Sequence, residues 1–244
     1  MSDVRIFDNI GRKAIVTGHY GSGKTEFAVS LALLVSKTCQ ENRPSDKVSR
    51  ISLIDLDIVN PYFRSQEKRG LLESSGISVY SNIYKNEITA ELPAIDASIR
   101  TPLESKTCRV IIDTGGNDTG ALVLNQFSKY FTDDTTVLAI VNANRPETSN
   151  IEGILEHIAA IEDITNLTVA FIVNNTHMLR ETKAADIIYG HDLCKKVSEL
   201  TGKHILCNCY PEGIVNPNEL KELTGQNENL MPLGLYLRPT WLDK

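Results

Sequence analysis

The sequence of 244 residues lacks the features that mark membrane, secreted and disulfide-stapled proteins. No apolar run approaches the length of a membrane span, and the N-terminal residues do not show the charged-then-apolar layout of a secretory signal. The five cysteines are an odd number scattered along the chain, which favours a reducing compartment over a disulfide framework. From these absences we expect a protein of the cytoplasm.

The sequence also lacks an excess of basic residues. Its formal net charge is −6, so general affinity for nucleic acid or for an anionic membrane is not expected. Apolar residues make up 41% and charged residues 23%, the balance of an ordinary globular protein. The sequence has no internal repeat, low-complexity tract or linker that would separate a second domain. We therefore predict one domain over residues 1–244, with a core at about 11–223 and a C-terminal tail at 224–244.

Short apolar runs alternate with longer helical patterns along the chain. The expected strands are residues 13–17, 50–55, 77–80, 109–113, 136–141, 168–173 and 204–207, and the clearest expected helices are residues 26–35, 148–161 and 184–200. This alternation is typical of βαβ units, and near-continuous apolar strands indicate a sheet that is covered on both faces. The predicted fold class is α/β, with a doubly wound, mainly parallel sheet in a three-layer sandwich.

The most informative segment lies between the first expected strand and the first expected helix. It fits the P-loop (Walker A) pattern G-x-x-x-x-G-K-[ST] and reads Gly18-His19-Tyr20-Gly21-Ser22-Gly23-Lys24-Thr25. Glycines let backbone N–H groups surround phosphate oxygens, and the helix that follows adds the positive end of its dipole. Lys24 can reach the β- and γ-phosphates, and the Thr25 hydroxyl can ligate Mg²⁺. The alternative is a glycine-rich turn that only starts a helix, but the flanking strand and helix favour nucleotide binding by these eight residues.

Acidic residues follow two of the other expected strands. Because ligands of such a sheet bind outside the carboxyl ends of the strands, Asp55, Asp57 and Asp113 are expected to face the P-loop. Asp55 and Asp113 are candidates for a Mg²⁺ site, and Asp57, further from its strand, is better placed to orient an attacking water. The catalytic candidates are thus Asp57 and Lys24. The alternatives are a solvent-facing carboxylate for Asp113 and a helix N-cap for Asp55 or Asp57.

These motifs resemble those of the ParA/MinD/Mrp and CobQ/CobB group of P-loop NTPases, which belongs to the SIMIBI class. The segments that carry the resemblance are, besides the P-loop, residues 55–61, 113–120, 141–149, 173–175 and 210–212. The resemblance implies ATP and Mg²⁺ as ligands, with Asp57 orienting water, Asp113 holding a magnesium-bound water, and Asn174 and Pro211 in the base pocket. Residues 174–177 lack the aspartate of the Asn-Lys-x-Asp sequence that reads guanine, which favours adenine.

The chain departs from the family pattern at one P-loop position. Many ParA and MinD members carry a second lysine after the first P-loop glycine, which reaches the nucleotide of a partner in a sandwich dimer. This chain has His19 there, so that a homodimer that depends on such a lysine is in doubt. Arg64, Lys68 or Arg145 could supply the positive charge instead, and the sequence does not choose among them.

The expected activity is that of an ATPase, a nucleoside-triphosphate hydrolase that works as a switch for an unidentified protein partner in metalloprotein or enzyme maturation. One alternative is a biosynthetic enzyme that activates a small carboxylate, as in CobB or dethiobiotin-synthetase relatives, with a small-molecule substrate. Others are a positioning or partition ATPase and a nucleotide-binding regulatory module without hydrolysis.

Two cysteines raise a separate hypothesis. Cys207 and Cys209 lie on one side of an expected extended segment, and two such pairs across a symmetric dimer could hold zinc, nickel or an iron–sulfur cluster. The alternative is a pair of small residues in the core, since free cysteine is often buried.

Overall fold

One parallel sheet organises the molecule. The computed structural model describes residues 6, 9–41, 50–57, 68–81, 97–116, 118–225 and 229–237, and every structural statement below concerns these residues. The sheet has eight strands in the order β3-β2-β4-β1-β5-β6-β7-β8, and every neighbouring pair is parallel. The strands are β1 (Lys13–Gly18), β2 (Arg50–Asp55), β3 (Ile77–Ser81), β4 (Cys108–Asp113), β5 (Thr135–Val141), β6 (Val169–Asn174), β7 (His204–Pro211) and β8 (Leu230–Leu233).

Helices connect the strands and cover both faces of the sheet. The α-helices are α2 (Lys24–Glu41), α3 (Arg69–Ser74), α4 (Arg100–Glu104), α5 (Asp118–Leu122), α6 (Ile151–Thr165), α7 (Ala184–Thr201) and α8 (Pro217–Thr224). Short 3-10 turns lie at η2 (Ala97–Ile99), η3 (Val123–Tyr130), η4 (Pro146–Thr148) and η5 (Leu179–Glu181). The predicted α/β fold with a doubly wound parallel sheet is confirmed.

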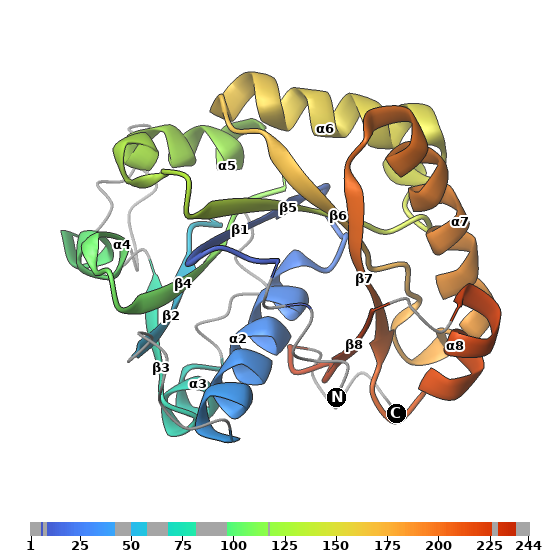
Figure 1. The fold of residues 1–244 in the computed structure, drawn as a ribbon, viewed down its shortest axis with the longest axis horizontal. Helices are drawn as coiled ribbons and strands as arrows, with labels where there is room; N and C mark the ends of the chain where they lie inside the picture. The colour runs from blue at the N-terminus through green and yellow to red at the C-terminus, as the bar shows by residue number, and fades with distance from the viewer. Residues whose placement is uncertain are drawn as a thin grey trace.

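The three layers are visible in Figure 1, with α2 and α3 on one side of the sheet and α4, α5, α6 and α7 on the other. On the first side, Phe27 of α2 belongs to one buried cluster with Val16 of β1. On the second side, Ile154 of α6 and Val197 of α7 belong to another buried cluster with Ile15 of β1. Because Ile15 and Val16 are neighbours on one strand, their side chains point to opposite faces, and β1 contributes to both cores.

The seven strands expected from apolar runs are all present, and β8 is an addition. The central strands β1, β4 and β5 bury nearly all of their side chains, which is why their sequences read as continuous apolar runs. Strand β8 lies within residues 224–244, the segment assigned to the tail. It is the edge strand of the sheet and pairs with β7 alone. Pro232, which has no N–H to donate, is tolerated in an edge strand because only one side of such a strand takes part in the ladder.

The helix ends follow ordinary capping chemistry. The Asn150 side chain accepts a hydrogen bond from the Gly153 amide at 2.8 Å at the start of α6, and Asn166 ends that helix in the left-handed conformation. Gly202 ends α7 in the same way, with a φ of 72°. These local signals fix where the long helices of the second face begin and end.

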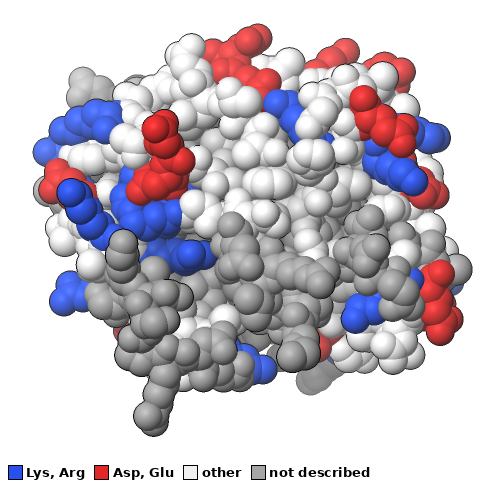
Figure 2. All heavy atoms as spheres, in the orientation of Figure 1, with Lys and Arg blue, Asp and Glu red and all other residues white. Residues whose placement is uncertain are grey.

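Charged side chains are dispersed over the surface. Figure 2 shows Lys and Arg interspersed with Asp and Glu around the rim of one face, while the described residues at its centre are mostly uncharged. Within the described part of the chain, no helix is both long enough and apolar enough to span a bilayer.

The parallel topology determines where a ligand can be reached by many residues at once. All strands run in one direction, so their carboxyl ends lie along one edge of the sheet. The loops that follow β1, β2, β4, β5, β6 and β7 therefore meet at this edge, and they carry the P-loop and the acids identified from the sequence.

Candidate functional site

The P-loop, residues 18–25, connects β1 to α2 as the motif predicts. Gly21 and Gly23 have φ values of 75° and 82°, in the left-handed region that favours glycine. The Ser22 amide donates to the His19 carbonyl at 3.1 Å, and the Phe27 amide donates to the Gly23 carbonyl at 3.0 Å. The loop thus passes directly into the first turn of α2, and the strand–loop–helix setting of the motif is confirmed.

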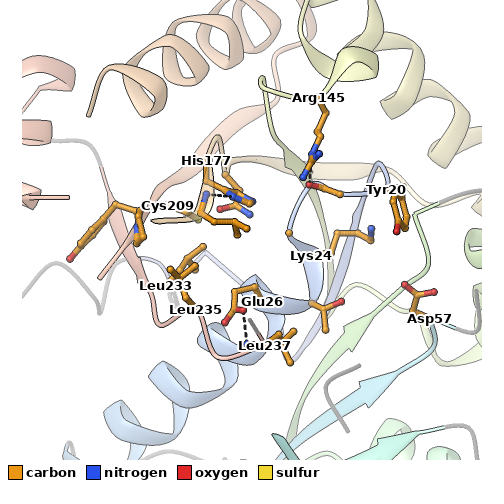
Figure 3. A pocket seen from close by; sticks show the side chains of 17 residues that line it. Tyr20, Lys24, Glu26, Asp57, Arg145, His177, Cys209, Leu233, Leu235 and Leu237 are labelled. Atoms are coloured by element: carbon orange, nitrogen blue, oxygen red, sulfur yellow. Dashed lines mark hydrogen bonds between the residues drawn. The ribbon is translucent and has the colours of Figure 1, made fainter. Parts of the chain in front are cut away.

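A cavity of about 380 Å³ lies beside the P-loop (Figure 3). One end, which we call the polar end, is lined by Tyr20, Lys24, Thr25 and Asp57. The other, which we call the apolar end, includes His177, Cys209, Leu233, Leu235 and Leu237, as Figure 3 shows, and the cavity is also lined by Asn175, Leu179, Tyr210 and Pro211. A cavity of this size with a few polar groups at one end and apolar walls at the other is typical of a small-molecule site.

Lys24 is the buried cation of the polar end. Only 6% of the residue is exposed, and its Nζ atom donates to the His19 carbonyl at 3.2 Å. Burial lowers the pKa of Lys24, while the negative charges of Asp113 and Asp57 act in the opposite direction. The ammonium is therefore largely buried and under the influence of two carboxylates, and it borders the cavity, where an anionic ligand could reach it.

Asp113 is a buried acid behind the polar end: neither it nor Asp55 lines the cavity, but the charge of Asp113 acts on Lys24. It ends β4, in register with Asp55 of β2, and neither of its carboxylate oxygens has a hydrogen bond of ordinary geometry among the described residues, although the nearby Thr25 hydroxyl acts to lower its pKa. Burial and the neighbouring Asp55 raise the pKa of Asp113 well above its usual range, and the charge of Lys24 acts against this rise. A buried carboxylate without hydrogen bonds is costly unless a cation or a donor satisfies it, so Asp113 fits the role of a metal ligand.

Asp55 and Asp57 occupy different positions at the end of β2. One Asp55 side-chain oxygen accepts a hydrogen bond from the Asp57 amide at 3.1 Å, which turns the chain after the strand. Asp57 is 9% exposed and lines the polar end together with Lys24 and Thr25. The segment that follows, at residues 58–67, includes part of the family-like sequence and lies outside the described residues.

The loop after β4 lies against the P-loop. A Cβ atom added at Gly116 would lie 2.7 Å from the Lys24 Nζ atom and 2.7 Å from the Tyr20 amide nitrogen. A side chain at Gly116 would collide with the Tyr20 backbone, so glycine at this position is explained by contact between two loops of the site.

Arg145 reaches the P-loop from the loop after β5. Its Nε atom donates to the Gly21 carbonyl at 2.9 Å, and the residue lines the cavity, as Figure 3 shows. Lys68 is described but does not line the cavity, and Arg64 lies outside the described residues. Of the three cations considered from the sequence, Arg145 is thus the one seen at the site. His19 does not line the cavity, and its Nδ1 atom lies 3.7 Å from the Glu147 Oε2 atom.

The assignment of Asn174 to a base pocket requires correction. Its side-chain amide donates to the Ile187 carbonyl and the Asn208 side chain, both at 2.8 Å, and its side-chain oxygen accepts from the Thr176 amide and hydroxyl. The side chain is fully buried and its hydrogen-bonding capacity is used, so Asn174 fastens β6 to α7 and β7 and does not face a ligand.

Asn175 takes the place at the cavity that Asn174 was expected to hold. Its side-chain amide donates to the Ser22 carbonyl at 2.7 Å, which ties the end of β6 to the P-loop, and the residue lines the cavity. Pro211 also lines the cavity, and its assignment to a base pocket remains a prediction. The apolar end is otherwise formed by residues that the sequence motifs do not single out, above all Leu233, Leu235 and Leu237.

His177 presents a neutral ring to the cavity. Its Nδ1 atom accepts a hydrogen bond from the Leu179 amide at 3.3 Å, which places the proton of the neutral ring on Nε2. Burial, together with the positive charge of Arg145, lowers the pKa of His177 to about 4. At neutral pH the ring is therefore an uncharged, flat surface with one N–H donor.

Cys207 and Cys209 lie inside the protein. They are 1% and 2% exposed, and both belong to the core cluster on the α2 side of the sheet. Burial raises the pKa of Cys209 well above its usual range, with a further contribution from Cys207. A four-thiolate site across a dimer needs thiols that a second chain can reach, so this burial argues against that site. No cluster of three or more His, Cys, Asp or Glu side chains able to hold a metal occurs in the described part of the chain.

Comparisons with known proteins identify the fold. No protein-family model and no curated protein matches the sequence. Among solved structures, the cell division protein FtsY from Thermotoga maritima is similar, with a TM-score of 0.51 and 18% identity, over 83% of this chain and 67% of that chain. A nucleotide-binding protein from Archaeoglobus fulgidus in complex with ADP matches over 70% of each chain, with 18% identity and a TM-score of 0.40. The likeness to FtsY agrees with the parallel sheet and the P-loop described above, and the chain has the fold of the P-loop NTPases.

Proposed function

We propose that this chain binds ATP together with Mg²⁺, hydrolyses the ATP, and uses the bound state as a switch. The observation that carries the proposal is the polar end of the cavity, where a P-loop holds the buried Lys24 ammonium within the electrostatic influence of the fully buried Asp113 carboxylate, whose oxygens have no hydrogen bond of ordinary geometry among the described residues. This is the charge arrangement that a metal-bound triphosphate would complement, because the phosphates pair with the ammonium and the metal with the carboxylate.

Thr25, Asp55 and Asp113 would hold the Mg²⁺ ion. All three offer oxygen ligands, which Mg²⁺ prefers, and the unpartnered oxygens of Asp113 are the feature that a cation would satisfy. Protein sites for Mg²⁺ use one or two carboxylates and leave the other positions to phosphate and water, so a larger cluster of acids is not required. When bound, the metal would neutralise charge on the phosphate oxygens.

Asp57 and Lys24 would carry the hydrolytic step. Asp57 borders the cavity beside Lys24, where its carboxylate can orient a water molecule and accept a proton from it. The water oxygen would attack the γ-phosphorus while the bond to the β–γ bridging oxygen breaks. Lys24 would stabilise the negative charge that develops on the phosphate oxygens during this exchange.

The apolar end of the cavity supports adenine as the base. A guanine reader needs an acceptor for the N1 and N2 protons, ordinarily a carboxylate. The carboxylate nearest to the apolar end that lines the cavity is Glu26, and both of its oxygens accept backbone N–H groups, from Tyr236 and Leu237. Among the described residues that line the cavity, the one carboxylate at this end is thus already engaged by the backbone, which favours a base without the guanine N1 and N2 donors.

A switch role is supported by the contact between the two loops of the polar end. Gly116 lies against Lys24 and the Tyr20 backbone, so a γ-phosphate held by Lys24 would act on the loop after β4. We propose that this loop reports the phosphate state to a protein partner in metalloprotein or enzyme maturation. Capture with the Asp57→Asn protein in its ATP state is expected to retain such a partner. ATP turnover stimulated by one small carboxylate would instead favour a biosynthetic enzyme.

The central test removes the P-loop lysine. In Lys24→Ala, affinity for ATP–Mg²⁺ measured by calorimetry is expected to fall by at least about 30-fold, because a buried charge partner of the phosphates is lost. The matched control is Lys37→Ala, an exposed lysine of the same helix, whose affinity is expected to match wild type. Asp57→Asn is expected to bind ATP but to release little phosphate. If Lys24→Ala bound ATP as tightly as Lys37→Ala, the proposed function would be wrong.

A further inference from the structure

A carboxylate in the first turn of α2 fastens a segment from the far end of the chain. The Glu26 Oε1 atom accepts a hydrogen bond from the Tyr236 amide at 2.5 Å, and its Oε2 atom accepts one from the Leu237 amide at 2.9 Å. The two bonded partners are 210 and 211 positions away in the sequence. We call residues 233–237 the leucine segment, because Leu233, Leu235 and Leu237 alternate along it.

The attachment joins a largely buried carboxylate to backbone N–H groups and has a second contact on the same helix. Burial raises the pKa of Glu26, and the two backbone N–H groups act in the opposite direction by stabilising the charged form. A second, longer contact lies one helical turn further on, where the Gly234 amide donates to the Ser30 hydroxyl at 3.4 Å. Glu26 and Ser30 are four residues apart, so they lie on the same face of α2, which holds the leucine segment along its length.

The leucine segment forms one wall of the apolar end of the cavity. Leu233, Leu235 and Leu237 all line it, and Figure 3 shows them with Glu26 on the side of the cavity opposite His177. Leu235 has a φ of 50°, a left-handed conformation that leucine rarely adopts. Such strain persists only where the surroundings impose it, and it is frequent at ligand-binding sites.

The opposite wall is flat and uncharged. His177 packs its ring close to the P-loop, since a Cβ atom added at Gly23 would lie 2.9 Å from its Nε2 atom. Its Nδ1 atom is occupied by the Leu179 amide, so the ring orientation is fixed. A flat aromatic group between the two walls would bury one face against the neutral imidazole ring and the other against the leucine side chains.

We propose that Glu26 is a positioning residue that holds the leucine segment as one wall of a slot for a nucleobase, with His177 as the other wall. The inference rests on the proposed function, which supplies the nucleotide, and adds how the base is held. Because Glu26 follows Lys24 and Thr25 directly, one helical turn both contacts the phosphates and sets the base wall. Glu26 itself does not touch the reacting atoms.

Two ligands separate the base wall from the phosphate site. ADP–Mg²⁺ needs both ends of the cavity, whereas tripolyphosphate–Mg²⁺ needs the polar end alone. In Glu26→Ala we expect ADP affinity to fall at least about tenfold, which corresponds to about 1.4 kcal/mol. Tripolyphosphate affinity is expected to stay within about twofold of wild type, because this ligand does not reach the base wall. Glu26→Gln keeps one acceptor for the two N–H groups and is expected to lie between wild type and Glu26→Ala.

A second variant removes the wall without removing the attachment. In Leu235→Gly the side chain is lost from the cavity, and the left-handed backbone at this position suits glycine, so the protein is expected to fold. ADP affinity is again expected to fall about tenfold or more with tripolyphosphate affinity unchanged. The matched control is Glu152→Gln, which alters an exposed first-turn glutamate of α6 outside the cavity and is expected to behave as wild type.

The outcomes distinguish failure of this inference from failure of the nucleotide site. Wild-type protein that bound neither ADP nor tripolyphosphate would overturn the proposed function and the inference with it. Wild-type protein that bound both, with Glu26→Ala and Leu235→Gly showing equal changes for the two ligands or no change, would overturn the inference alone. If the Glu26 variants did not fold, Leu235→Gly would decide by the same comparison.

Discussion

Replacement of Gly23 by alanine tests how tightly the P-loop is packed against the end of β6. A Cβ atom at this position would lie 2.5 Å from the Asn175 side-chain nitrogen and 2.9 Å from the His177 Nε2 atom. The backbone there has a φ of 82°, so alanine would also be strained by about 1–2 kcal/mol. Two costs are therefore combined in one variant.

A matched glycine separates these two costs. Gly76 has a φ of 78°, and a Cβ atom there would meet nothing within 4 Å. Gly76→Ala is thus expected to lose about 1–2 kcal/mol of unfolding free energy from backbone strain alone. In Gly23→Ala the Asn175 amide must also leave the Ser22 carbonyl, and this buried hydrogen bond adds about 1–3 kcal/mol to the loss.

The assay is urea unfolding of both variants without nucleotide, with the free energy extrapolated to water. We expect Gly23→Ala to lose about 1–3 kcal/mol more than Gly76→Ala, at similar denaturant slopes. In an Asn175→Ala background the excess cost of Gly23→Ala should shrink, since the colliding amide is gone. Equal losses in the two variants, or no change in the Asn175→Ala background, would refute the proposed packing of the P-loop against Asn175.

Two further predictions concern residues outside the ligand contacts. Although burial acts in the opposite direction, hydrogen bonds from Lys13, Thr132 and Arg12 lower the pKa of Asp134 to about 2. The contribution of Asp134 to stability is therefore present above about pH 4 and is lost as the pH falls toward 2. Asp134→Asn is therefore expected to lower the free energy of unfolding by about 1 kcal/mol at pH 7, after allowance for the exposure of Asp134, and by less at pH 2. If urea titrations gave the same loss at both pH values, the charge of Asp134 would not be its cause. Asn174→Ala is expected to lower the free energy of unfolding by about 2 kcal/mol, because the buried partners of Asn174 lose their hydrogen bonds. The ratio of ATP affinity to GTP affinity is expected to stay unchanged, and a changed ratio would show that Asn174 does belong to the base pocket.

The sheet could be predicted from the sequence wherever a strand is buried on both faces. Such strands, β1 and β4 among them, have near-continuous apolar sequences, whereas a strand with one exposed face alternates apolar and polar residues. Strand β8 escaped prediction because it is four residues long and contains Pro232, which an edge strand tolerates and a central strand does not.

The polar end of the site was predictable because its signal is local. The P-loop is a contiguous pattern, and Asp55 and Asp113 end strands that the sequence already delimits. The apolar end is assembled from distant segments, and its key tie joins Glu26 to Tyr236, which no local pattern encodes. The error at Asn174 has a geometric cause. Adjacent residues at the end of a strand point to opposite faces of the sheet. The Asn174 side chain therefore contacts α7, whereas the side chain of the next residue, Asn175, contacts the P-loop.

The long span of the Glu26 tie has a consequence for biosynthesis. The P-loop strand β1 emerges from the ribosome early, but its sheet neighbours β4 and β5 lie about a hundred residues later, and the leucine segment follows later still. Such distant pairings make folding slow, because long loops must close before contacts are gained. A nucleotide would therefore reach its full affinity only after residue 237 has left the exit tunnel and the leucine segment has joined α2.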